Sequence, residues 1–129
     1  MERVSLHPEP RRREIIHAGM PLISPAGEIG SEFGEVPYFG PAEVRTADGQ
    51  VLRQEILENP HRAVGKQKEI LVAEWLVRRG IDMLHTVRAV NKGPGYVLRE
   101  AGVEMRRIRR TRFADELALF RREIVADDA

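Results

Sequence analysis

The stretch MLHTVRAVNKGPGYVLREAGVEMRRI, residues 83–108, decides the fold class of this 129-residue chain. Its two ends, residues 83–90 and 103–108, are mainly apolar and predict two strands. Between them, Pro94 follows Gly93 and begins a short predicted helix, which Gly102 ends. Two strands joined through a helix lie parallel in one sheet, with a right-handed crossover. The stretch therefore predicts an α/β fold.

Residues on the N-terminal side extend this predicted sheet. Residues 15–23, IIHAGMPLI, predict a buried strand. Residues 38–45 and 51–57 predict a hairpin, because the Ala-Asp-Gly-Gln sequence at 47–50 has the residues of a tight turn. The sequence therefore predicts a mixed sheet of about five strands.

Two longer helices are predicted to cover this sheet. The first, over residues 63–79, places Leu71 and Trp75 opposite its main apolar face, so we expect the C-terminal helix or another subunit to cover them. The second, over residues 112–125, has one apolar stripe, formed by Phe113, Leu117, Phe120 and Ile124. With helices on both faces of the sheet, the predicted architecture is an α/β three-layer sandwich.

Composition excludes several classes of chemistry. The absence of cysteine excludes disulfides, thiolate zinc sites, a cysteine nucleophile and all-cysteine iron–sulfur clusters. The strand at 15–23 has no carboxylate, whereas two-metal nucleases need acids on adjacent strands, so we expect no enzyme. No apolar stretch is long enough for a membrane span and the N-terminus lacks the apolar core of a signal peptide, which predicts a soluble, cytoplasmic chain.

The net charge of +1 does not predict a polyanionic partner, but arginines gather over residues 106–112. These arginines either bind along a phosphate backbone or prevent an edge strand from pairing with another sheet. Aromatic residues for base stacking are nearly absent there. We therefore favour the edge strand and expect no nucleic-acid partner.

Several motifs occur in a fixed order along the chain. They are IGSEFGEVPYF at 29–39, ENP at 58–60, EWLV at 74–77 and GPGYVLREAGVE at 93–104. Together they resemble the dinitrogenase iron-molybdenum cofactor biosynthesis domain family, in particular the version fused to the cytosolic end of cation diffusion facilitator transporters. The resemblance covers residues 14–125 and implies a ribonuclease H-like fold of about five strands.

The resemblance also implies a ligand loop. The family has a histidine before Phe-Gly, and here that position is Glu32, followed by Phe33 and Gly34. A carboxylate is a harder ligand than imidazole, and suits a divalent metal ion better than an iron-containing cofactor. Alternatively, Glu32 is a surface residue and Phe33 a core residue. We expect a positive φ at Gly34.

A second candidate site lies at the predicted strand-to-helix turn, residues 91–95. Backbone N–H groups at the start of a helix attract anions, and Lys92 adds positive charge beside Gly93 and Gly95. The same glycines also suit a turn with no ligand. In the related family this edge of the sheet faces the proposed cofactor cleft.

Residues 1–13 are predicted to be an N-terminal strand and linker, separate from a domain over 14–129. The segment VSLHPEP resembles the closing strand of the cation diffusion facilitator cytosolic domain, which implies metal ligands at His7 and Glu9. Two ligands do not complete a zinc site, so others must come from elsewhere. His17, His61 and His85 are expected to be structural.

These observations predict a non-catalytic cytosolic module that binds a divalent metal ion or an iron-containing cofactor. The resemblance implies an accessory or regulatory domain linked to a cation diffusion facilitator, with a membrane transporter domain or a second copy as partner. The alternative is a protein-interaction or dimerisation domain that has lost its metal site. The replacement of the family's histidine by Glu32 and the lack of cysteine favour that alternative.

Overall fold

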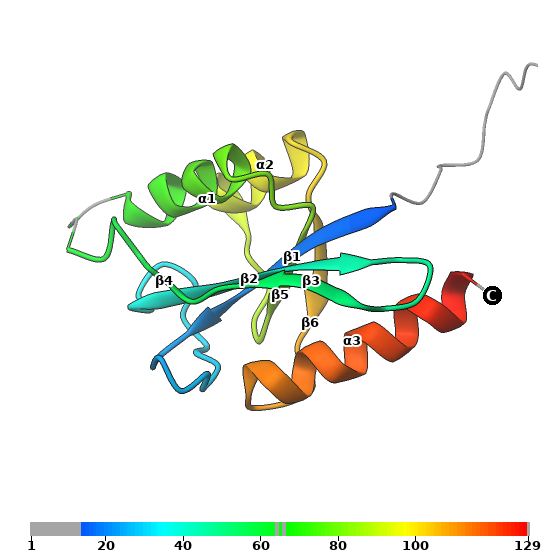
Figure 1. Cartoon of the computed structure of the whole chain (residues 1–129). Helices are drawn as coiled ribbons and strands as arrows, with labels where there is room; N and C mark the ends of the chain where they lie inside the picture. Colours follow the sequence, from blue (N-terminus) through cyan, green and yellow to red (C-terminus); the bar gives the residue numbers. More distant parts are fainter. Residues whose placement is uncertain (1–13, 64, 66, 129) are drawn as a thin grey trace, which may run out of the picture.

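A computed structural model describes residues 14–63, 65 and 67–128. The described residues form a mixed six-stranded sheet and three helices (Figure 1). In chain order the elements are β1 (Ile15–Leu22), β2 (Tyr38–Arg45), β3 (Val51–Gln54), β4 (Leu57–Glu58), α1 (Lys68–Arg78), β5 (Met83–Thr86), α2 (Lys92–Glu100), β6 (Glu104–Arg107) and α3 (Phe113–Asp128).

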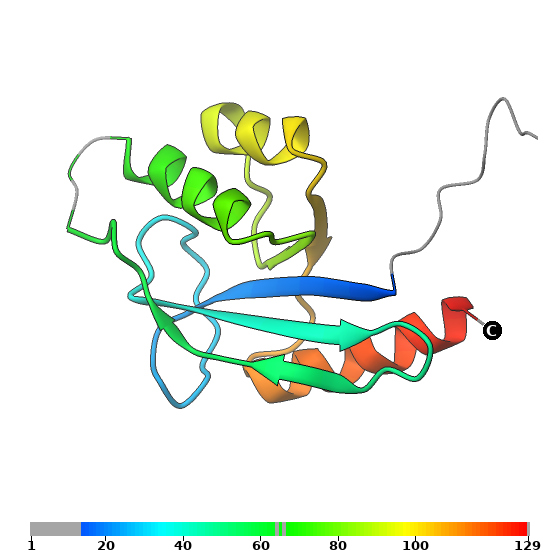
Figure 2. The same cartoon turned by 45° about the horizontal axis from the view of Figure 1, so that its top comes forward.

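The sheet has the order β3-β2-β1-β5-β6, and β4 pairs with β2. β5 is parallel to both β1 and β6, as the predicted strand–helix–strand connections require, whereas β2 is antiparallel to its neighbours. α1 and α2 lie on one face and α3 lies on the other (Figure 2). The predicted α/β three-layer sandwich with helices on both faces is confirmed.

Each face of the sheet has its own hydrophobic core. Alternate residues of β1, from Ile16 to Leu22, point toward α3 and pack on its predicted stripe, whose four members Phe113, Leu117, Phe120 and Ile124 are all buried. On the opposite face, Phe39 and Leu84 pack against buried residues of α1 and α2. The apolar run at residues 15–23 therefore identifies a buried strand, and the helical stripe identifies the buried face of α3.

Several predicted boundaries differ from the structure, and the strand expected over 83–90 ends at Thr86. The strand expected over 51–57 is interrupted and forms β3 and β4. The first helix begins at Lys68 and not at residue 63, after Gln67 takes a left-handed φ of 59°. α2 begins at Lys92, two residues before Pro94. Hydrogen bonds to other loops compete with regular structure at such ends, and periodicity does not report them.

The expectation that the C-terminal helix covers Trp75 is wrong, because α3 packs on the other face of the sheet. Trp75 is half-buried beside the α1–α2 core. Its ring packs edge-on against Phe39 with centroids 5.7 Å apart, and the Arg79 guanidinium lies 5.8 Å from its centroid. The sheet and a cation therefore cover this side of α1.

β6 is an edge strand, as the arginine pattern predicts. Arg106 on this strand donates to Glu104 at 2.6 Å, which keeps charge on the exposed edge. None of the helices in the described part of the chain is both long and apolar enough to span a membrane. The predicted strand and linker at residues 1–13, with His7 and Glu9, lie outside the described residues.

Candidate functional site

Two loops leave the sheet at the carboxyl ends of the parallel strands β1 and β5. The first covers residues 23–37, and the second, residues 87–91, leads into α2. In open α/β sheets, ligands bind in the crevice outside this edge. The fold therefore places the segments that contain Glu32 and Lys92 at the edge where a ligand is expected.

A tight turn presents Glu32 to solvent. The N–H of Glu35 donates to the carbonyl of Glu32 at 3.1 Å and closes the turn. Phe33, within the turn, is buried and packs edge-on against Phe39 with centroids 5.8 Å apart. The apolar side chain therefore anchors the turn in the α1–α2 core, while the carboxylate beside it stays exposed.

Gly34 is needed for close packing and not for a positive φ, so the expectation of a left-handed conformation there is wrong. A Cβ on Gly34 would lie 2.3 Å from Cγ and 3.3 Å from Cα of Glu69 in the first turn of α1. Lys68, next to Glu69, donates to the Glu35 carboxylate at 2.8 Å. The turn at residues 32–35 thus lies directly on the start of α1.

Asn59, from the ENP motif, holds the end of the same loop. Its side-chain amide is buried and donates to the Val36 carbonyl at 2.9 Å, and its backbone N–H donates to the Pro37 carbonyl at 2.8 Å. Its side-chain oxygen accepts from the N–H of His61 at 2.9 Å. Asn59 therefore positions the loop by satisfying backbone groups, and His61 takes part through its backbone.

The structure joins the two loops through an ion pair that the sequence did not suggest. Arg88, in the loop after β5, reaches Glu32 at 3.8 Å. Both side chains are exposed, so this pair alone contributes little stability. The only sequence signal for Arg88 was a cation near the end of the strand predicted over 83–90, and it is a weak one.

The start of α2 is shaped by close contacts. Lys92 is exposed and has a left-handed φ of 57°. A Cβ on Gly93 would lie 2.8 Å from Cδ1 of Ile70 on α1, and one on Gly95 would lie 2.5 Å from the Val90 carbonyl oxygen. Both glycines are therefore explained by packing. Lys92 and Arg88 give this edge two exposed cations.

The described residues do not form a complete metal site. No group of three or more His, Asp or Glu residues gathers within residues 14–63, 65 and 67–128. Glu32 offers one carboxylate, and Arg88 competes for it with any metal cation. His85 is buried in the other core with Glu116. The donor set at this edge therefore fits an anionic group better than a bare metal ion.

Comparisons with known proteins show the fold. No protein-family model and no curated protein matches the sequence. Solved structures with the same fold include PH0822, with TM-score 0.69 and 15% identity over 84% of this chain and 92% of that chain. The apo form of the orange protein from Desulfovibrio gigas gives 0.65 and 17%, over 84% and 88%. TM1290, a Thermotoga protein of the DUF35 family described as a NifB protein, gives 0.61 and 21%, over 81% and 86%. At these identities, the similarity establishes a shared α/β fold.

Proposed function

We propose that this chain is a non-catalytic module that binds a metal-containing anionic cofactor at the carboxyl edge of β1 and β5. The observation that carries the proposal is the contact between Glu32 and Arg88, which joins the two loops at that edge. Two of the structural neighbours, the orange protein and the NifB protein, support a connection to this class of cofactor domain.

The residues divide the task of binding. Arg88 and Lys92 attract an anionic group, and Arg88 has a planar array of donors that matches oxyanions. The Glu32 carboxylate is the available oxygen ligand for a metal atom within such a group. Phe33, Gly34, Gly93 and Gly95 hold the two loops against the core and against α1. The cofactor itself would bring the remaining metal ligands.

The first experiment is elemental analysis of untagged protein purified without oxygen. We expect a metal to be retained in a fixed ratio to protein. The second is calorimetric titration with molybdate, with Mn²⁺ and with Fe²⁺, each as a separate probe. Molybdate should bind more tightly than either cation, because Arg88 and Lys92 can donate to an oxyanion, whereas Arg88 competes with a cation for the Glu32 carboxylate.

Variants separate the roles of the two charged residues. Arg88→Met should weaken molybdate binding about tenfold, since a hydrogen bond to a charged group contributes roughly 1.5–3 kcal/mol. Arg122→Met, which removes an exposed arginine from α3, is the matched control. Glu32→His restores the family's ligand and should increase Zn²⁺ and Fe²⁺ binding.

A protein with no bound metal, no response to any probe and no gain in Glu32→His would contradict the proposal. The interaction or dimerisation function would then be preferred, and a concentration-dependent mass in sedimentation would support it. We further propose a link to a cation diffusion facilitator and a location at the cytosolic face of the membrane. That link depends on residues 1–13, and specific capture of such a transporter by the full chain, lost in a His7→Ala, Glu9→Ala double variant, would support it.

A further inference from the structure

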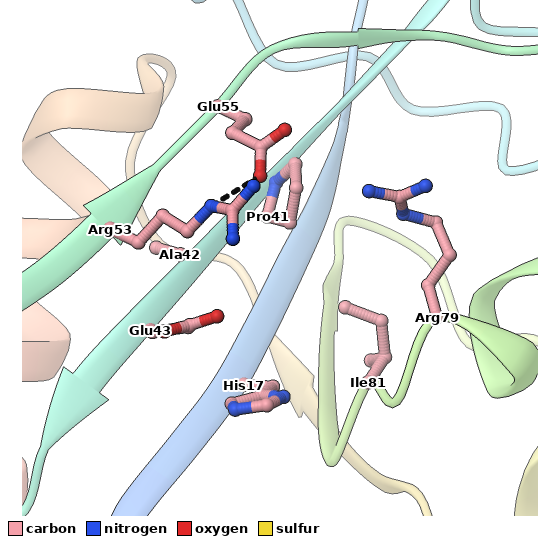
Figure 3. Close-up of a pocket in the computed structure, with 8 residues that line it drawn as sticks. All are labelled: His17, Pro41, Ala42, Glu43, Arg53, Glu55, Arg79 and Ile81. Atoms are coloured by element: carbon pink, nitrogen blue, oxygen red, sulfur yellow. Dashed lines mark ion pairs between the residues drawn. The ribbon is translucent and has the colours of Figure 1, made fainter.

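A second concave site lies on the same face of the sheet as α1, at the C-terminal end of that helix. Its cavity has a volume of about 140 Å³. The lining residues come from β1, β2, β3 and the segment around the end of α1 (Figure 3), namely His17, Pro41, Ala42, Glu43, Arg53, Glu55, Arg79 and Ile81. None of these residues belongs to the Glu32–Arg88 edge.

Strand register builds the polar side of this cavity. His17 on β1 lies opposite Glu43 on β2, and Glu43 lies opposite Arg53 on β3. Side chains at directly opposed positions project from the same face of a sheet, so the three form a row across it. Arg79 approaches from the end of α1 (Figure 3). Polar groups from four elements therefore meet at one cavity.

The charges in this cavity are only partly matched. Arg53 pairs with Glu55 at 2.8 Å. Within the part of the chain that the structure describes, neither Glu43 nor Arg79 forms an ion pair, and Arg79 instead lies over the Trp75 ring. One carboxylate and one guanidinium are thus left to face a ligand.

His17 adds a directed polar atom. Its Nδ1 lies 3.1 Å from the Gly80 carbonyl oxygen, which can only accept, so Nδ1 carries the proton in this contact. In the neutral ring Nε2 is then a hydrogen-bond acceptor. Around the cavity the Glu43 carboxylate and Nε2 of His17 are acceptors, and the Arg79 guanidinium is a donor. This set suits a molecule that has both an ammonium and a carboxylate group.

We propose that this cavity binds a small zwitterion of the free α-amino acid class. The ligand's carboxylate pairs with Arg79, and its ammonium group pairs with Glu43 and donates to Nε2 of His17. The positive charges of the two lining arginines equal the negative charges of the two lining glutamates. The cavity therefore does not favour a polyanion such as phosphate.

Size restricts the ligand further. Drug-sized ligands occupy pockets of about 300–1,000 Å³, while a single water needs roughly 10–15 Å³. A cavity of about 140 Å³ therefore fits a molecule of a few non-hydrogen atoms. An adjoining cavity of about 10 Å³, lined mainly by apolar residues that include Leu57 and Trp75, suits a ligand side chain no larger than a methyl group.

Trp75 is the only tryptophan of the chain, and its contact with Arg79 makes its fluorescence a direct reporter of this cavity. The test titrates the full chain with L-alanine, and separately with acetate and with methylamine. Acetate carries only the carboxylate charge of L-alanine, and methylamine carries only its ammonium charge. We expect a saturable change in Trp75 fluorescence with L-alanine. The dissociation constants of acetate and methylamine should each be at least about tenfold larger than that of L-alanine.

Two variants test the assigned contacts by calorimetry, which does not depend on Trp75. Glu43→Gln and Arg79→Met should each weaken L-alanine binding about tenfold. Arg78→Met, one residue away on α1, is the matched control and should bind as the parent does. Glu32→His should also leave L-alanine binding unchanged, which separates this proposal from the cofactor site.

Three results would overturn the proposal. The first is no saturable response to L-alanine in either fluorescence or calorimetry. The second is acetate binding as tightly as L-alanine, which would indicate an anion site. The third is unchanged affinity in both Glu43→Gln and Arg79→Met.

Discussion

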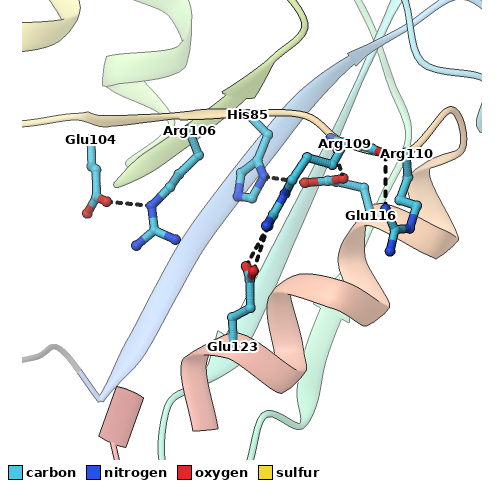
Figure 4. Close-up of polar contacts among 7 residues, drawn as sticks. All are labelled: His85, Glu104, Arg106, Arg109, Arg110, Glu116 and Glu123. Atoms are coloured by element: carbon cyan, nitrogen blue, oxygen red, sulfur yellow. Dashed lines mark hydrogen bonds and ion pairs between the residues drawn. The ribbon is translucent and has the colours of Figure 1, made fainter. Parts of the chain in front are cut away.

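His85 and Glu116 form a buried polar pair between β5 and α3, 31 positions apart in the chain. Nδ1 of His85 lies 3.3 Å from one carboxylate oxygen of Glu116, and the other oxygen accepts from the Arg109 N–H at 3.0 Å (Figure 4). The side chains are 2% and 0% exposed. Phe120 packs edge-on against the His85 ring, so the pair lies within the core beneath α3.

Replacing Glu116 by alanine should destabilise the protein strongly. The change would leave the Arg109 N–H and the buried His85 ring without their acceptor, and each buried polar group left unsatisfied costs about 1–3 kcal/mol. Glu116→Gln should cost less, because an amide oxygen still accepts. Urea unfolding measures both. Glu123→Ala, which removes the partly exposed partner of the Arg109 side chain, is the control and should cost at most about 1 kcal/mol. Equal losses in Glu116→Ala and Glu123→Ala would contradict the assignment.

Stability should fall as the pH is lowered through the range of histidine titration. Burial lowers the pKa of His85 below its ordinary value, and the hydrogen bond to Glu116 opposes this only in part. The unfolded chain therefore binds a proton at His85, near pH 6.5, before the folded chain does. This contribution to stability is fully present above about pH 6.5 and is lost as the pH falls. Urea unfolding between about pH 5 and pH 7.5 measures this slope, which should be shallower in His85→Gln. An identical slope in that variant would contradict the prediction.

Gly34→Ala should disturb the turn that carries Glu32. The new methyl group would overlap the Glu69 side chain and approach its Cα, and overpacking of this kind costs about 1–3 kcal/mol. Thermal unfolding of Gly34→Ala, Glu69→Ala and the double variant forms a double-mutant cycle. The glycine replacement should cost less where Glu69 is already alanine. If the losses of stability in the two single variants add up to the loss in the double variant, residues 34 and 69 do not contact each other.

Asn59→Ala should loosen the loop while the sheet stays folded. The Val36 carbonyl would lose its donor and the His61 N–H its acceptor, at a cost of about 1–3 kcal/mol. Hydrogen exchange should show faster exchange over residues 29–37 than in the parent, with little change in β5. Gln54→Ala on β3 is the control, because Gln54 is exposed and the change removes a comparable amide. Equally faster hydrogen exchange in all strands of the sheet would instead indicate that the whole protein is destabilised.

Trp75→Ala should lower the melting temperature through loss of the contact with Phe39. Burial of a large apolar side chain contributes about 1.5–3 kcal/mol, and Trp75 is only half-buried, so the lower end of that range applies. Tyr96→Ala is the control, because Tyr96 is 62% exposed. A variant that melts like the parent would contradict the packing of Trp75 on the sheet.

The sequence by itself determined the layers of this protein. The apolar run at residues 15–23 predicted a buried strand, and the stripe from Phe113 to Ile124 follows the helical period, so burial of that stripe is a local consequence of the period. The strand–helix–strand order at residues 83–108 likewise required parallel pairing. Boundaries were less predictable: α1 begins after the left-handed φ at Gln67, which no period in the sequence encodes.

Only the tertiary structure decided which polar side chains meet. Four strands and α1 lie between Glu32 and Arg88 in the chain, and 23 positions separate Val36 from Asn59. Such pairs form because two strand ends share one edge, and no period in the sequence encodes that distance. Gly34 shows the same limit: its φ was predicted wrongly because the constraint is the close approach of Glu69 on α1 and not the conformation of Gly34 itself.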